Sequence, residues 1–425
     1  MPFGRDAISY LAELREHWRP LAAATLGLAT GMSAIGTVTS AIAPTLVEDT
    51  GWSKADFALV GSMAIVTAFI FPLVGRLADV LGVKRTALIG LVAMPLIYLA
   101  YSLMSGDLRV YVAIFFVQSL VAVTTTATVY TRLVVQHIEK ARGLALAIAV
   151  SGPALTGAIG GPILNAYVEA NGWREAFHAV AIFTAIAGVI TFLLIPRDKQ
   201  AAVRTQQPKR RARDDYPQIF RSTTFWILLV VMLLCNLPMT IMLVQLKLLL
   251  LDNGVSGEGA AVMFTALSVG MLIGRFAAGV GLDRFRAHIV AFVTLGLPSL
   301  GLFVIASSWD APLVLTTAVF FLGFAFGAEG DIVAFLVARH FGVQIYSSVM
   351  GLLTCAMSFS TASGALLLSV TLAKTGGYEL YLVIVGTAVL VGASLLLLLG
   401  REEGKHPHKV GEAPPAPGAS GTAAG

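Results

Sequence analysis

Runs of about twenty apolar residues recur along almost the whole chain, and they constrain its fold more than any other feature. An α-helix needs about 20 such residues to cross a hydrocarbon core of roughly 30 Å. Of the 425 residues, 57% are hydrophobic and 12% are charged, whereas about 25% are charged in an ordinary soluble domain. The chain is therefore expected to be an all-α integral membrane protein.

The breaks between the apolar runs divide the chain into twelve predicted membrane-spanning helices, arranged as two halves of six. The spans are predicted at residues 20–47, 55–80, 85–104, 108–136, 141–169, 174–195, 222–251, 257–282, 287–307, 311–340, 344–373 and 378–400. The longest polar stretch between spans, residues 196–221, separates the halves 20–195 and 222–400. We expect residues 1–19 and this linker to be cytoplasmic, and the Pro-, Ala- and Gly-rich tail 401–425 to be disordered.

Lysine and arginine gather in every second connector, which predicts the orientation of the chain. The connectors on one side contain Arg76, Lys84, Arg85, Lys140, Arg142, Arg284, Arg286 and Arg339, besides the basic linker. Because positive residues mark the cytoplasmic side, both termini are predicted to lie in the cytoplasm. The same connectors account for the net charge of +5, so this charge does not indicate a nucleic-acid partner.

An internal repeat relates the two halves. The segment "TGWSKADFALVGSMAIVTAFIFPLVGRLAD" (50–79) is echoed by "NGVSGEGAAVMFTALSVGMLIGRFAAGVGLD" (253–283), which places the second and eighth spans in equivalent positions. Parallel halves of this kind form transporters whose substrate site lies between the repeats, near the bilayer midplane. An enzyme is disfavoured, since the sequence contains no metal cluster, nucleophile triad or phosphate-binding loop.

The segment "GRLADVLGVKR" (75–85) lies at the cytoplasmic end of the second predicted span. Its first glycine permits close helix contact, and Asp79 places a charge where a helix N-terminus can meet it. The segment resembles the loop motif of the major facilitator superfamily, and the resemblance covers residues 20–400. It implies the fold of that superfamily and a gate on the cytoplasmic side, although a purely structural turn is the alternative. The gating role is carried onto Gly75, Arg76, Asp79, Gly82, Lys84, Arg85 and, in a weaker copy, Gly279, Asp283 and Arg284.

Two further motifs resemble one branch of that superfamily. "GWSKADF" (51–57) and "GWREAF" (172–177) look like the monocarboxylate and oxalate/formate transporters. That branch carries an arginine in its eighth helix, followed by a glycine four residues later, and Arg275 with Gly279 fits this placement. The resemblance implies that the arginine holds the substrate carboxylate. The eleventh span has no lysine, and Met271 stands where animal relatives carry an acid, which argues against oxalate and leaves the substrate open.

Arg275 lies within the eighth span, where an arginine costs about 2.5–3.5 kcal/mol on insertion scales and almost always faces a cavity or a partner. Its guanidinium can bind a carboxylate bidentately, as a substrate anchor would. The alternative is a permanent ion pair with Glu329, which lies at a similar depth on the tenth span. Asp331 points about 200° away from Glu329 around that helix. Either acid is a candidate proton carrier, and we expect Arg275 and Glu329 to form a coupled pair.

Polar side chains on other spans are further candidates for substrate binding. They are Thr30, Gln118, Tyr130, Asn236 and Gln245. Asn236 is favoured because Pro238 predicts a bend that exposes backbone carbonyls at mid-span. Three bases near span ends, Arg132, Lys247 and Arg339, are expected to reach the membrane interface and to be structural.

Together these observations predict a secondary active transporter of a small organic anion, a mono- or dicarboxylate. We expect it to work by alternating access with a proton, as a monomer in a bacterial inner membrane and without a cofactor. Membrane lipid is a further partner, which "KRRAR" (209–213) could bind unless that segment is simply solvated. The alternative is a proton-driven exporter of drugs or other amphipathic molecules, for which Arg275 would be dispensable.

Overall fold

The computed structural model describes residues 3–52, 65–196, 212–307, 309 and 311–400. The predicted start of the second span, most of the linker with most of "KRRAR", and the C-terminal tail lie outside the described residues. Nearly all described residues are helical and none of them forms a β-strand, which confirms the predicted all-α class.

The N-terminal half begins with a helix that precedes the first span. This helix is α1 (Phe3–Glu16). The others in this half are α2 (Trp18–Thr30), α3 (Met32–Thr50), α5 (Ile65–Leu81), α6 (Val83–Leu103), α7 (Leu108–Ala122), the 3-10 turn η1 (Val123–Thr125), α8 (Ala127–His137), α9 (Arg142–Leu155), the π-helical turn η2 (Thr156–Gly160) and α10 (Gly161–Leu194).

The C-terminal half begins with α12 (Ala212–Arg221), at the end of the linker. Its other helices are α13 (Thr223–Cys235), the π-helical turn η3 (Ile241–Gln245), α14 (Leu246–Asp252), α15 (Gly257–Arg284), α16 (Ala287–Ile305), α17 (Pro312–Phe341), α18 (Tyr346–Thr375), α19 (Glu379–Leu395) and the 3-10 turn η4 (Leu396–Leu398).

Nine helices of the described residues are long and apolar enough to cross a membrane, or up to ten if the bent pair α12 and α13 is one span. The twelve predicted spans differ from this number for three reasons. The described part of the second span is only the 17 residues of α5, and the seventh span is interrupted after α13, before Pro238. The fifth and sixth spans run on as one helical stretch of 53 residues, which at 1.5 Å per residue is about 80 Å long.

That long stretch is two spans because it turns at Gly172. The backbone of Gly172 has φ 81° and ψ 171°, a left-handed conformation that favours glycine. Trp173 then ties this turn to the end of the first span by donating from Nε1 to Oδ2 of Asp49 over 2.8 Å. The "GWREAF" motif therefore makes the sharp connection between the fifth and sixth spans.

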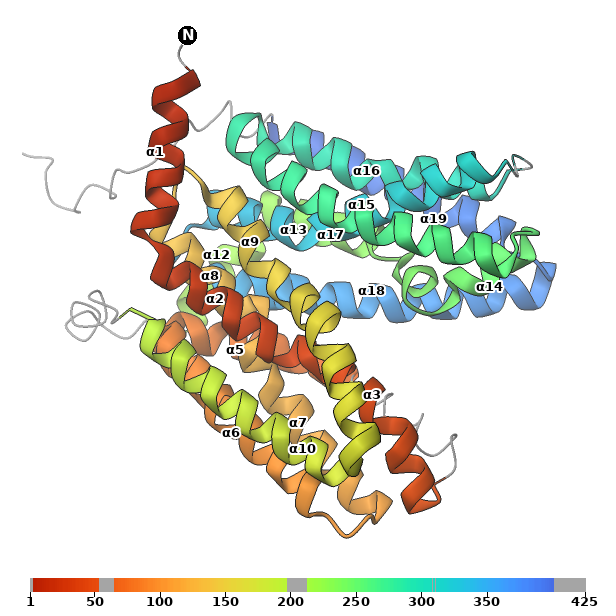
Figure 1. The fold of residues 1–425 in the computed structure, drawn as a ribbon. Coiled ribbons are helices and arrows are strands. Elements are labelled where there is room, and N and C mark those ends of the chain that lie inside the picture. The colour runs from red at the N-terminus through yellow and green to blue at the C-terminus, as the bar shows by residue number, and fades with distance from the viewer. Residues whose placement is uncertain (1–2, 53–64, 197–211, 308, 310, 401–425) are drawn as a thin grey trace, which may run out of the picture.

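The two halves share a hydrophobic core at one end only. One cluster of buried side chains draws on both halves and includes Val74 and Leu146 of the first half with Val337 and Val349 of the second. Two further clusters belong to the C-terminal half alone and to the N-terminal half alone. The halves meet where α1 and α12 lie, here called the linker end, and diverge towards the ends of α3 and α14 (Figure 1).

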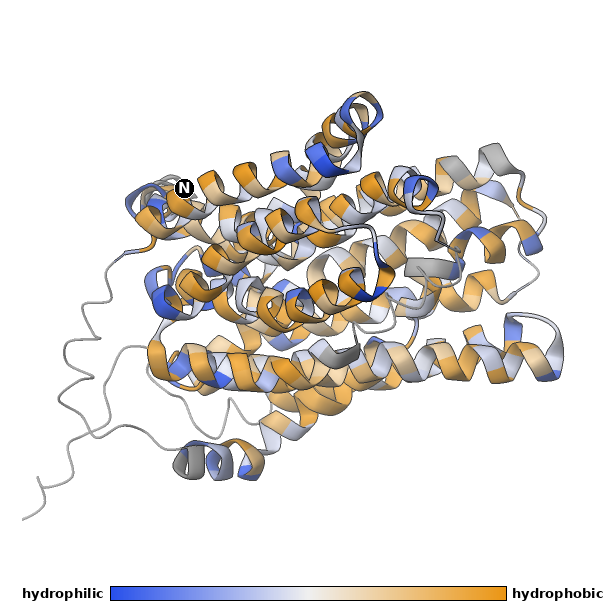
Figure 2. Ribbon diagram, turned by 90° about the horizontal axis from the view of Figure 1, so that it is seen from below, coloured by the Kyte–Doolittle hydropathy of each residue, from blue (hydrophilic) through white to orange (hydrophobic). Residues whose placement is uncertain are grey.

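The outer surface is apolar along the length of the helices. Hydrophobic colour covers most of each ribbon, while hydrophilic residues gather mainly near helix ends and in connections (Figure 2). Leu193, Leu313 and Leu366 are each at least 70% exposed. Such a surface is stable in lipid and would aggregate in water.

Helices α15 and α17 pack backbone to backbone, which sets the register of the central residues. A Cβ atom on Gly323 would lie 2.1 Å from the carbonyl oxygen of Leu267, and one on Gly327 would lie 2.0 Å from that of Met271. Membrane helices approach this closely only where small residues face each other. The four-residue spacing on both helices places residue 331 opposite residue 275.

Replacing Gly327 with alanine should destabilise the protein, because the new methyl group would overlap the Met271 carbonyl. Overpacking of this kind costs about 1–3 kcal/mol. Gly36→Ala is the matched control, since a Cβ there meets nothing within 4 Å and alanine is the better helix former. We expect thermal unfolding in detergent to begin several degrees lower for Gly327→Ala only; equal melting temperatures would disprove the close packing.

Candidate functional site

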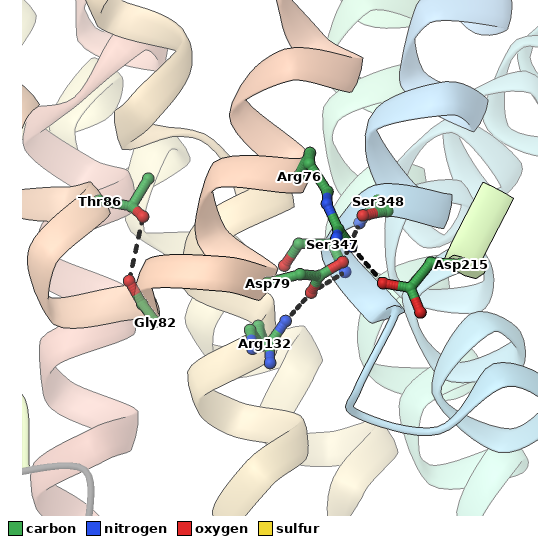
Figure 3. Close-up of polar contacts among 8 residues, drawn as sticks. All are labelled: Arg76, Asp79, Gly82, Thr86, Arg132, Asp215, Ser347 and Ser348. Carbon is green, nitrogen blue, oxygen red and sulfur yellow. Dashed lines mark hydrogen bonds and ion pairs between the residues drawn. The ribbon is translucent and has the colours of Figure 1, made fainter. Parts of the chain in front are cut away.

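Asp79 at the end of α5 joins the two halves at the linker end. It accepts hydrogen bonds from the backbone N–H groups of Ser347, over 3.1 Å, and Ser348, over 2.6 Å. These are the first free N–H groups of α18, where the helix dipole favours a negative charge. The guanidinium of Arg132, on α8, forms an ion pair with the same carboxylate (Figure 3).

Asp283 at the end of α15 makes the equivalent contact in the opposite direction. It accepts hydrogen bonds from the backbone N–H groups of Gly143, over 2.6 Å, and Leu144, over 3.1 Å, at the start of α9. Each half therefore supplies an aspartate that binds the N-terminus of a helix in the other half. The repeat seen in the sequence thus extends to the contacts that its two copies make.

Both copies of the motif need their glycine for this approach. A Cβ on Gly75 would lie 2.1 Å from the carbonyl oxygen of Ser347, and a Cβ on Gly279 would lie 2.7 Å from that of Gly143. Any larger residue would force the halves apart and lengthen the aspartate contacts.

The predicted position of Arg132 was wrong. We expected its side chain to reach the membrane interface, but it is fully buried. The reason is the Asp79 carboxylate, which supplies the negative charge that a buried guanidinium requires. No periodicity on the fourth span indicates this partner, which lies on another helix.

The remaining motif residues connect the linker end to its surroundings. Arg76 forms an ion pair with Asp215 of α12 (Figure 3). Lys84 donates to the carbonyl of Ile195, over 3.0 Å, at the end of the sixth span. Gly82 has φ 82° and directly precedes α6. The side chains of Arg85 and Arg284 are exposed.

Sequence reasoning missed the contacts of α1. The carboxylate of Glu13 accepts from the backbone N–H groups of residues 139, 140 and 141 at 2.8–3.3 Å, just before α9. The hydroxyl of Tyr10 donates to Asp283 of the other half. We call Tyr10 and Glu13 with these partners the α1 clasp, since one short helix holds both halves. A 14-residue amphipathic helix ahead of the first span was the available signal.

The two side chains of the clasp have shifted pKa values. Burial raises the pKa of Tyr10, as does its hydrogen bond to Asp283, so the phenol stays a donor. Burial also raises the pKa of Glu13, but its three backbone donors outweigh this effect and hold the pKa below the ordinary value. Glu13 is therefore ionised at neutral pH.

Arg275 lies between the halves and bonds to both. Its Nε donates to the carbonyl of Gly327, on α17, over 2.9 Å, and its Nη1 donates to the carbonyl of Val150, on α9. Its Nε also lies 3.6 Å from Oδ2 of Asp331, and the arginine side chain is 16% exposed. The lipid-facing position is thereby excluded for this residue.

The predicted partner of Arg275 was wrong, because Asp331 and not Glu329 forms the ion pair. Depth along the helix places both acids near the arginine, but rotation around it decides between them. Residues 323, 327 and 331 follow one face of α17, which the glycines press against α15. Glu329 lies on a different face, so the expectation that the two acids face apart agrees with the structure.

Glu329 bonds within the C-terminal half. Its Oε1 accepts a hydrogen bond from the side-chain amide of Asn236, and both residues are buried. Glu329 also lines a small cavity of about 30 Å³ together with Pro238, Met239 and Met242. The bend at Pro238 thus brings Asn236 to the tenth span, but away from the ion pair of Arg275.

Three of the other four predicted substrate ligands form hydrogen bonds within their own halves. Gln118 accepts from the Tyr101 hydroxyl over 3.1 Å, and Gln245 accepts from that of Tyr378 over 3.2 Å. Thr30 donates to its own helix, at the carbonyl of Leu26. Tyr130 is fully buried. Among the described residues, none of these four side chains forms a hydrogen bond or ion pair with Arg275.

Comparison with known proteins decides the family. The family model described as Major Facilitator Superfamily matches residues 21–365 and 238–422. The chain belongs to the major facilitator superfamily. It is a multi-pass membrane transporter, and the resemblance stated from the sequence motifs is confirmed. Among the described residues, no group of three or more His, Cys, Asp or Glu is placed to hold a metal ion.

Two curated relatives are distant. "MFS-type transporter pynF" of Aspergillus niger is 25% identical over 252 residues, which cover 58% of this chain and only 56% of the fungal protein. Human "Monocarboxylate transporter 11" is 23% identical over 376 residues, or 84% of this chain and 78% of the human protein. The name of the second relative belongs to the monocarboxylate branch that the sequence motifs indicated.

Solved structures show the same fold. The human organic anion transporter MFSD10 superposes with a TM-score of 0.65 at 16% identity, covering 89% of this chain and 99% of that one. FucP in its outward conformation superposes with a TM-score of 0.66 at 13% identity, covering 89% and 98%. At these identities the likeness establishes the fold of this transporter and not its substrate.

Replacing Asp79 with asparagine should destabilise the linker end, because it leaves the Arg132 charge buried without its partner. Breaking a buried ion pair in this way costs about 3–5 kcal/mol. The exposed Arg85, in the same motif, provides the control: Arg85→Gln should stay within about 0.5 kcal/mol of the native protein. The double variant Asp79→Asn with Arg132→Met should regain part of the lost thermal stability. Failure of the double variant to recover would show that the pair's charge is unimportant.

Replacing Glu13 with glutamine should loosen the α1 clasp and open the linker end more often. Because folding lowers the pKa of Glu13, its stabilising effect is complete at neutral pH and is lost only as the pH falls below the ordinary pKa of a glutamate. We expect Glu13→Gln to raise the labelling rate of a cysteine at buried Ala147 roughly tenfold, for about 1.4 kcal/mol, with Cys235 and Cys355 replaced by serine. Exposed Glu16→Gln on the same helix should leave this rate unchanged.

Proposed function

We propose that this transporter moves a small organic anion, a mono- or dicarboxylate, together with a proton by alternating access. In this proposal Arg275 binds the substrate carboxylate and Asp331 carries the proton. The observation that carries it is the position of Arg275, whose guanidinium lies between the halves with a buried acid 3.6 Å away. A lipid-facing arginine would not make contacts to both halves.

The Arg275 guanidinium keeps binding capacity in this conformation. An arginine has five N–H donors, and the bonds to the Gly327 and Val150 carbonyls use two of its nitrogens. A fork of remaining donors suits the planar, bidentate recognition of a carboxylate. A lysine in the same place would supply charge without this geometry.

Asp331 is the better candidate for the proton carrier than Glu329. It is completely buried, and neither of its carboxyl oxygens accepts a hydrogen bond from the described residues. Removal from water penalises the charged form of a carboxyl group, while a nearby arginine stabilises it. A substrate anion at Arg275 would weaken that stabilisation and favour proton uptake by Asp331. Glu329, in contrast, accepts a hydrogen bond from Asn236.

The shared core at the linker end supports a conformation that is open on the opposite side. If the linker and both termini are cytoplasmic, as the basic connectors indicate, this conformation faces outward in a cell inner membrane. The aspartates at the helix N-termini then serve as the cytoplasmic gate. Monocarboxylate transporter 11 adds support for an anionic substrate, since its name describes such cargo.

Uptake into proteoliposomes tests the proposal directly. Labelled lactate, pyruvate and short dicarboxylates are offered with and without an inward proton gradient. We expect one acid to be taken up, and Arg275→Gln to reduce its uptake about 10–100-fold, as for a lost hydrogen bond to a charged group. Arg275→Lys should recover only part of this loss.

The proton step is tested separately in the same vesicles. Asp331→Asn should abolish stimulation by the proton gradient while substrate exchange across the membrane continues. Lys247→Gln is the matched control, because this exposed cation lies on α14 and its loss should change neither measurement. Uptake that is insensitive to Arg275→Gln would disprove the anchor, and transport of amphipathic cations or drugs in place of acids would favour an exporter.

A further inference from the structure

A second binding site lies inside the N-terminal half, away from Arg275. It is a pocket of about 480 Å³ between the first, third, fifth and sixth spans, here called the N-half pocket. The pocket is lined mainly by apolar side chains, and none of its lining residues is charged. Pockets of this size hold small molecules. An organic anion would find no counter-charge in it.

The N-half pocket exists because the surrounding helices are irregular there. The first span breaks at Gly31, between α2 and α3. The fifth span contains the π-helical turn η2 between α9 and α10, and such turns often lie at functional sites. Regular helices would pack side by side and fill this space.

One buried donor points to a polar group on the ligand. Tyr98 lines the N-half pocket and is 1% exposed, yet its hydroxyl has no hydrogen-bond partner among the described residues. An unsatisfied buried hydroxyl costs about 1–3 kcal/mol. The hydroxyls of Thr30 and Thr184, in contrast, donate to the carbonyls of Leu26 and Val180. A ligand with one acceptor oxygen would satisfy Tyr98.

The rim and the length of the N-half pocket fit an acyl chain of a bilayer lipid. Ile163 and Phe183 line it and are 65% and 57% exposed on the apolar outer surface. From Leu155 to Tyr167 the lining covers about 18 Å at 1.5 Å per residue, close to the roughly 15 Å of one leaflet's hydrocarbon. Tyr98 lies only five residues before the end of α6 at Leu103, near the depth of lipid ester groups.

We propose that the N-half pocket binds one acyl chain of a bilayer phospholipid, whose ester carbonyl accepts a hydrogen bond from the Tyr98 hydroxyl. The chain fills the space that the bends at Gly31 and η2 create. The lipid belongs to the leaflet opposite the linker end. This site is separate from Arg275 and does not depend on which substrate is carried.

Native mass spectrometry of the detergent-purified transporter tests this site with two probes. One is a diester phosphatidylcholine and the other is its diether analogue, which has the same chains but lacks the ester carbonyls. The native protein should bind the diester about fivefold more tightly, the effect of one hydrogen bond. Tyr98→Phe should bind both lipids equally, at the affinity of the diether. The same ester preference in Tyr98→Phe would overturn the proposal.

A second pair of variants tests the pocket itself. Ile163→Trp places a large ring at the rim and should reduce the binding of both lipids at least tenfold. Ile186→Trp is the control, because Ile186 is 57% exposed on the sixth span but does not line the pocket. Because both positions face outward, neither change should prevent folding. Equal lipid binding by the two variants would show that the retained lipid lies elsewhere.

Discussion

Two aspartates, Asp79 and Asp283, hold the linker end together, and the rest of the structure depends on them. Every helix begins with N–H groups that lack a partner in their own helix, and here the first N–H groups of α18 and α9 bond to Asp79 and Asp283 from the opposite half. The shared hydrophobic core forms around these contacts. Beyond it each half has a core of its own, so the halves can separate at the far end without exposing a common interior.

Much of the fold could be predicted because a lipid bilayer permits few backbone structures to cross it. Twelve spans, two halves and the bend at Pro238 follow from apolar length, polar breaks and one proline. The α1 clasp could not be predicted, since Tyr10 and Asp283 are 273 residues apart in sequence. No sequence motif indicates that these two residues contact each other. The same holds for Arg132, whose partner is set by the packing of the fourth span against the second.

The candidate site shows where pattern reasoning ends. An arginine in the middle of a membrane span has a high free-energy cost of insertion and therefore indicates a functional or paired position. Arg275 could for this reason be found from the sequence. Its partner could not be chosen from depth, because Glu329 and Asp331 differ by only two residues. The glycines that press α17 against α15 decide the rotation and bring Asp331 forward. Their four-residue spacing was present in the sequence, but it becomes informative only once the two helices are known to touch.

The bond from Arg275 to the Val150 carbonyl joins the two halves of the transporter. In the proposed function, a carboxylate bound by the remaining donors draws the guanidinium towards itself and weakens the bond to Val150, so occupancy of the arginine and cohesion of the halves oppose each other. By reciprocity, whatever free energy the anion loses in breaking that bond is returned as an equal bias towards separation of α9 from α15. If Arg275 binds the cargo as proposed, cargo binding and the rearrangement of the halves are therefore coupled through its Nη1 atom.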